Sequence, residues 1–241
     1  YQTHVAWVGL DASYNPEFTA GRLSFSAFVV GNFGVINSGK TRESLSTAYT
    51  IAGVAANARL GYRYGGHRND VISGDFLFAS GDDADPTSKR YTGVITGNTW
   101  GSPGAAFTSS GAYLLLPHLN VVSRFYSAVQ DLSNMGYGLT AGTLNLSHEV
   151  WRNRLTLKVG GAVGLSNIAP TGGGSFIGVE GNAMVALQIR AFMSLELHGA
   201  YLKLGDFYDS PLTVQAPSSG PLPPGAAVRP TDPWTSFLAF K

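Results

Sequence analysis

The stretch Leu155–Leu165 reads LTLKVGGAVGL, and its residues alternate between two kinds of side chain. The odd-numbered positions carry Leu or Val, apart from Gly161, whereas the even-numbered positions carry Thr, Lys, Ala or Gly. Successive side chains of a β-strand point to opposite faces of the sheet. This period of two therefore predicts a strand with one apolar face and one face of small or polar groups.

The same pattern continues along the chain. In residues 177–191 it places Ile177 and Val179 on the apolar face, and Glu180 and Asn182 on the other face. About ten strands follow from such alternation, and many are long enough to cross a bilayer, which takes about 9–11 residues. The further candidates are residues 4–14, 23–29, 50–64, 71–80, 112–117, 143–149, 193–201 and 234–240.

The connections between these segments are of two kinds. Residues 149–154 and 190–192 are short, whereas 81–111, 167–175 and 205–233 are long and rich in Gly, Pro, Ser and Asp. Alternation of short turns and long loops is typical of outer-membrane barrels. Residues 119–132 break the pattern, because their apolar positions have helical spacing, which predicts a short amphipathic helix.

Composition favours a membrane barrel over a soluble β-sandwich or lipocalin-like barrel. Charged residues make up 13% of the chain, against about 25% in soluble domains. Aromatic residues also lie at predicted strand ends, as in the belts at membrane interfaces. We therefore predict an all-β, antiparallel up-and-down transmembrane β-barrel that occupies residues 1–241 as one domain, either complete or part of a larger barrel. The strand-end aromatic residues are Tyr62, Tyr64, Trp151, Tyr201, Phe207, Tyr208 and Trp234.

Residues 74–85, which read GDFLFASGDDAD, resemble a strand-to-loop segment of alginate-export-type outer-membrane β-barrels. Residues 61–64 and 234–241 are also similar to strands of that family. The resemblance implies an outer-membrane channel for an anionic or neutral polymer or for small solutes, with Arg and Lys lining the lumen. That family forms larger barrels, and outer-membrane barrels commonly finish on an aromatic residue, whereas Lys241 follows Phe240 here.

Charged residues on the predicted inner faces have two interpretations. Inward Arg and Lys side chains would select anions in a pore. Alternatively they pair with inward carboxylates, which the presence of both signs favours, since an unpaired buried charge is costly. The cations are Arg59, Arg63, Lys158 and Arg190, and the carboxylates are Asp75, Glu149, Glu180 and Glu196.

Other candidate sites are weaker. In the predicted helix, Arg124 and Phe125 would line a constriction if the helix folds inward. The group Asp82, Asp83 and Asp85 offers oxygen ligands for Ca²⁺ but lacks the Gly and distal Glu of a calcium loop, so a solvated turn is favoured. We expect no cofactor and no nucleic-acid partner, because the net charge is only +1 and no phosphate-binding loop is present.

These observations predict an outer-membrane channel of porin or polymer-export type, and not an enzyme. Two alternatives stay open. One is a barrel with a closed interior that anchors a protein partner through its long loops. The other is an outer-membrane hydrolase, although Ser147 and Glu149 would face away from His148 in a strand. Lipid of the bacterial outer membrane is the expected surrounding, and the sequence does not decide the solute or the oligomeric state.

Overall fold

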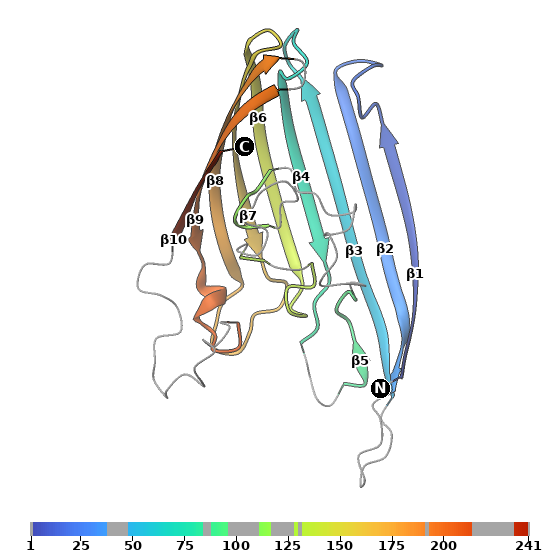
Figure 1. Cartoon of the computed structure of the whole chain (residues 1–241). Coiled ribbons are helices and arrows are strands. Elements are labelled where there is room, and N and C mark those ends of the chain that lie inside the picture. Colours follow the sequence, from blue (N-terminus) through green and yellow to red (C-terminus); the bar gives the residue numbers. More distant parts are fainter. Residues whose placement is uncertain are drawn as a thin grey trace.

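The computed structural model describes residues 2–37, 48–83, 88–95, 111–116, 128–129, 132–190, 193–213 and 234–240. These residues form one curved sheet in which neighbours along the chain are antiparallel neighbours in space, in the order β1-β2-β3-β4-β6-β7-β8-β9-β10 (Figure 1). The all-β, up-and-down prediction is therefore confirmed. The edges of the sheet are β1 and β10, and no pairing joins them in the described part of the chain.

The strands are long, because the alternating pattern continues without Pro or charge clusters to interrupt it. Those of the main path have between 7 and 16 residues, compared with about 5–6 in globular domains. Their bounds are β1 Gln2–Tyr14, β2 Leu23–Asn37, β3 Ala48–Arg63, β4 Val71–Ala79, β6 Leu139–Trp151, β7 Leu155–Leu165, β8 Phe176–Arg190, β9 Met193–Leu204 and β10 Trp234–Phe240.

The two ends of the sheet differ in their connections. Residues 15–22, 64–70, 152–154 and 191–192 join strands at one end, which we call the turn end. Residues 38–47, 80–138, 166–175 and 205–233 make the connections at the opposite end, the loop end. The strand bounds thus show the predicted alternation, with the longest intervals of sequence between strands all falling at the loop end.

The loop end carries the departures from the predicted elements. The described part of the strand predicted over 112–117, residues 112–116, has no strand structure and forms bends over 113–116. A short strand, β5 (Arg90–Tyr91), pairs in parallel with β3, and a 3₁₀ turn, η1 (Asp206–Asp209), follows β9. Most of the predicted helix, including Arg124 and Phe125, lies outside the described residues, and its described members at 128, 129 and 132 are not helical.

The two faces of the sheet have opposite character. We call the face in contact with residues 111–116 the inner face and the other the outer face. Leu144, Val159 and Val179 point outward and are 65%, 53% and 45% exposed, whereas the inward Thr143 and Glu180 are 6% and 2% exposed. The alternation in the sequence therefore sorts apolar side chains to the exposed surface and polar ones to the interior.

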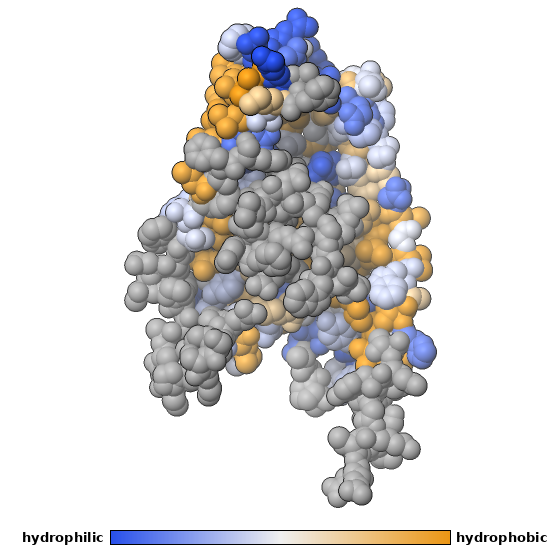
Figure 2. Space-filling model, in the orientation of Figure 1, coloured by the Kyte–Doolittle hydropathy of each residue, from blue (hydrophilic) through white to orange (hydrophobic). Residues whose placement is uncertain are grey.

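Hydrophobic residues extend along both flanks of the sheet in Figure 2, and hydrophilic residues gather at the turn end. An exposed aliphatic surface of this extent is unusual for a protein in water. Among the described residues, no helix has the length and hydropathy to cross a membrane.

Candidate functional site

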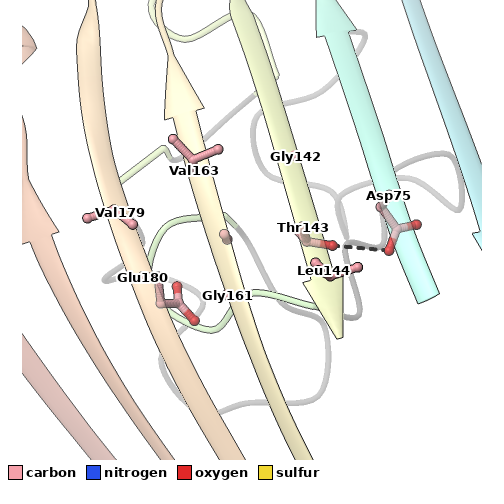
Figure 3. A pocket seen from close by; sticks show the side chains of 9 residues that line it. Asp75, Gly142, Thr143, Leu144, Gly161, Val163, Val179 and Glu180 are labelled. Atoms are coloured by element: carbon pink, nitrogen blue, oxygen red, sulfur yellow. Dashed lines mark hydrogen bonds between the residues drawn. The ribbon is translucent and has the colours of Figure 1, made fainter. Parts of the chain in front are cut away.

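The inner face of the central strands carries a belt of polar groups. Arg59 of β3 donates its Nε–H to Asp75 Oδ1 of β4 at 2.5 Å, and the two residues are direct cross-strand partners. Thr143 of β6 donates its hydroxyl to the other oxygen of Asp75 at 3.3 Å (Figure 3). The buried Asp75 carboxylate is thus paired with the Arg59 cation and with a hydroxyl group. Such charge pairing is the predicted alternative to anion selection by inward cations.

The other predicted cations have different surroundings. Arg63, at the turn end of β3, lies over the Phe18 ring at 4.7 Å and donates to the Phe18 carbonyl. Lys158 lies half-buried on the inner face between Ser147 of β6 and Met184 of β8. Arg190 is exposed at the turn end of β8, beyond a register shift, so it lies outside the central belt.

Two of the predicted carboxylates belong to local hydrogen-bond groups. Glu149 lies at the turn end, where it accepts hydrogen bonds from the side-chain amide of Asn69 and the main-chain N–H of Asn153. Glu196 of β9 lies 3.0 Å from His198 Nε2. The hydroxyl of Tyr113 is 3.4 Å from the other nitrogen of His198, which connects β9 to residues 111–116.

The fourth carboxylate, that of Glu180, holds a segment of chain against the sheet. Its Oε1 accepts the main-chain N–H of Tyr113 at 2.7 Å, and its Oε2 accepts those of Leu114 and Leu115 at 2.8 and 2.7 Å. Asn182, two residues along β8, donates to Glu180 Oε1 at 2.9 Å and to the carbonyl of Gly111 at 2.7 Å. We call residues 111–116 the inserted segment.

Apolar packing surrounds the inserted segment at the loop end of the interior. All six of its residues are buried. Burial raises the pKa of Tyr113 to about 12, and the charges of Glu180 and Glu196 add to this rise. The buried apolar side chains that pack together here are Ala55, Leu77, Ala79, Val94, Ala112, Tyr113, Leu114, Leu115, Leu116, Val129, Leu139, Ala141, Ala162, Ile177, Ala200, Leu202 and Phe207.

Two of the aromatic residues expected at a membrane interface belong to this interior instead. Phe207 of η1 is completely buried and makes edge-to-face contacts with Tyr137 and Tyr208, at ring-centroid distances of 5.7 and 5.2 Å. Tyr208 donates its hydroxyl to the carbonyl of Ala128, and burial raises its pKa. The expectation was wrong for this pair because η1 follows β9 and folds back toward β8 rather than continuing the strand.

One member of the acidic group at the start of the long loop makes hydrogen bonds within that loop. Asp82 Oδ1 accepts the main-chain N–H of Thr92 at 2.8 Å and the Thr92 hydroxyl at 3.2 Å. Asp83 is exposed, and Asp85 lies outside the described residues. Within the described ranges, no three His, Asp or Glu side chains are close enough to share a metal ion.

A second polar cluster lies at the turn end, and no pattern in the sequence predicts it. Asp70 accepts the main-chain N–H groups of Glu149 and His67, both at 3.0 Å, and these hydrogen bonds lower its pKa below that of an ordinary aspartate. His148 Nδ1 lies 3.1 Å from Asp70 and 2.9 Å from the hydroxyl of Tyr64. The members come from the β3–β4 turn and from β6, and only the sheet register brings them together.

An open depression of about 490 Å³ lies over the central strands (Figure 3). Outward-facing glycines leave its floor open. Its lining combines Leu144, Val163 and Val179 of the outer face with Asp75, Thr143, Ala162 and Glu180. A Cβ on Gly161 would meet the backbone oxygen of Glu180 at 3.3 Å, so the floor is main chain. Residues of the apolar outer face and three residues of the polar belt, Asp75, Thr143 and Glu180, therefore line the same depression.

Comparisons with known proteins name no family for this chain. No protein-family model matches the sequence, and no curated protein matches it significantly. The geometry of the two faces is thus the basis for a functional assignment.

Proposed function

We propose that this protein is a channel of β-barrel type in the bacterial outer membrane, through which small solutes or a polysaccharide diffuse. The observation that carries the proposal is the inverted distribution of side chains on the sheet. Large aliphatic residues are exposed on the outer face of nearly every strand, while Asp75, Asn145, Glu180 and Asn182 are buried on the inner face. Lipid is the solvent that favours such an arrangement.

Strand length and end structure support a membrane setting. Each central strand is at least as long as the roughly 9–11 residues that cross a bilayer, with β4 the shortest at 9 residues and β7 at 11. Exposed aromatic side chains lie toward both ends, with Trp151 and Tyr62 near the turn end and Tyr201 toward the loop end. Such residues suit the interface between lipid and water.

A membrane setting also requires that the sheet edges be covered, because lipid supplies no hydrogen bonds to unpaired backbone groups. The proposal therefore includes pairing of β1 and β10 with each other or with other strands. Cysteine pairs can test closure, since the chain has no cysteine of its own. In a closed barrel, oxidation of Leu10→Cys combined with cysteines placed singly along β10 gives an intramolecular cross-link at one register.

The inner surface suits a narrow path. Arg59, Asp75 and Lys158 place both signs of charge on the central inner face, and the inserted segment occupies the loop end of the interior. The resemblance to alginate-export-type barrels extends the proposal to an extended polymer as the transported molecule.

A second candidate function is a structural barrel with a closed interior that anchors a partner through its long loops. The apolar cluster around the inserted segment favours this alternative, because a dry packed region blocks water-filled passage. The two candidates differ in conductance and not in membrane insertion.

Reconstitution tests both. The purified protein is refolded in detergent, incorporated into lipid vesicles and fused with a planar bilayer, where the current is recorded at a fixed voltage. Co-flotation with vesicles together with stepwise conductance supports the channel. Co-flotation without conductance favours the closed barrel, and a monomeric protein that stays soluble without detergent contradicts both.

A further inference from the structure

The carboxylate of Glu180 receives four hydrogen bonds, and all four donors are uncharged amides. Three are consecutive main-chain N–H groups of the inserted segment, and the fourth is the side chain of Asn182. Burial of a charged group is costly unless hydrogen bonds replace its water. Here the inserted segment supplies most of that replacement, so its position and the charge of Glu180 are mutually dependent.

Apolar packing alone would not give the segment a unique position, because it is non-directional. The hydrogen bonds do, because Glu180 engages residues 113–115 while Asn182 holds the carbonyl of Gly111 at 2.7 Å. The two side chains point inward from alternate positions of β8 and together fix both ends of a short stretch of main chain.

We infer that Glu180 is the positioning residue that keeps the inserted segment in the interior and thereby sets the width of the pore. This inference rests on the proposed channel function for its conductance readout. Its structural part, the anchoring of the segment, can be measured independently.

The rate at which a reagent labels a thiol in the inserted segment measures the anchoring without a conductance experiment. Ala112 is completely buried, and Ala112→Cys adds a single thiol to a chain that has none. We expect a membrane-impermeant maleimide to label this thiol slowly in the parent protein. In the Glu180→Gln background labelling is expected to be about tenfold faster. The neutral amide has one acceptor oxygen in place of two, and its NH₂ group faces main-chain N–H groups that the carboxylate had accepted, so these donors lose their partner.

Glu149→Gln is the matched control. Glu149 and Glu180 are both 2% exposed and both bind amide donors, but Glu149 lies in the turn-end cluster, away from the inserted segment. The control should leave the labelling of the cysteine at position 112 unchanged. It separates release of the segment from general loss of a buried carboxylate.

Single-channel conductance tests the effect of this anchoring on the width of the pore. Glu180→Gln is expected to raise the single-channel conductance above that of the wild type and of Glu149→Gln.

The outcomes separate this inference from the proposed function. Equal labelling of the cysteine at position 112 in the Glu180→Gln and Glu149→Gln backgrounds overturns the inference, and so does a wild-type channel whose conductance Glu180→Gln leaves unchanged. Faster labelling with no conductance in any variant supports the anchor and contradicts the channel. If Glu180→Gln does not refold, Asn182→Ala is measured in the same way, with faster labelling expected and unchanged labelling overturning the inference.

Discussion

Ile177 and Val179 are two positions apart in β8, yet their side chains lie on opposite sides of the sheet. Val179 is exposed on the outer face, whereas Ile177 is completely buried in the interior cluster. The cause is a β-bulge. Gly164 of β7 pairs with Gly178 and Leu165 pairs with Phe176, so Ile177 has no partner on β7 and the alternation reverses.

The bulge predicts an unequal response of two glycines in β8 to substitution by alanine. Gly178 has φ +159°, and a Cβ there would lie 2.6 Å from the backbone oxygen of Lys203, whereas a Cβ on Gly181 meets nothing within 4 Å. We expect Gly178→Ala to lower the free energy of unfolding by about 1–3 kcal/mol. Gly181→Ala, the control, should be neutral or slightly stabilising. Urea unfolding in lipid vesicles measures both, and equal effects would contradict the bulge.

The ion pair between Arg59 and Asp75 predicts a non-additive pair of substitutions. Arg59→Ala removes the ion-pair partner of the buried carboxylate and leaves it the Thr143 hydroxyl and the charge of Lys158, which we expect to cost about 1–3 kcal/mol of unfolding free energy. The double variant with Asp75→Ala should cost less than the sum of the single variants. Additive losses in a double-mutant cycle would show that the pair contributes nothing.

The assignment of faces predicts opposite tolerances for an added charge. Val159 is 53% exposed on the outer face, in the middle of β7, and Val159→Arg should destabilise the protein in lipid by about 2–4 kcal/mol. Ala186 points inward opposite Glu196, so Ala186→Arg should cost less because the new cation gains a carboxylate partner. Vesicle unfolding curves compare the two, and a larger loss for Ala186→Arg would reverse the assignment.

The turn-end cluster predicts loss of stability in acid. Hydrogen bonds from the main chain at Glu149 and His67 lower the pKa of Asp70. A depressed folded pKa means that the contribution of Asp70 to stability is complete above its unfolded pKa of about 3.9 and is lost as the pH falls through the folded value. Unfolding midpoints measured between neutral pH and pH 3 should therefore fall more steeply for the wild type than for Asp70→Asn. Parallel curves would contradict this linkage.

The architecture of the sheet could be predicted because its information is local. The period of two in residues such as Thr156 and Leu157 identifies both the strand and the faces of its side chains, and the short segment 152–154 requires an antiparallel neighbour. Register in such a sheet follows from the same pattern, since a slip by one residue would exchange the two faces.

The interior could not be predicted, because its contacts join distant parts of the chain. Residues 112–117 have the apolar content of a strand, and only the carboxylate of Glu180 on β8 and the surrounding cluster explain why residues 112–116 form no strand there. Asp70 and His148 likewise meet only through the register of β4 with β6. Neither contact corresponds to a residue spacing that could be recognised in a single sequence.

Glu180 binds residues 113–115 in a way that does not depend on which amino acids occupy these positions. From these three residues the carboxylate accepts only main-chain N–H groups, which every residue except proline possesses. Side chains at these three positions are therefore free to be exchanged for others of similar size without loss of the contact, whereas a single proline would remove one of its donors. The binding of this stretch by Glu180 is thus independent of the side chains at these positions, and it would persist if they were redesigned.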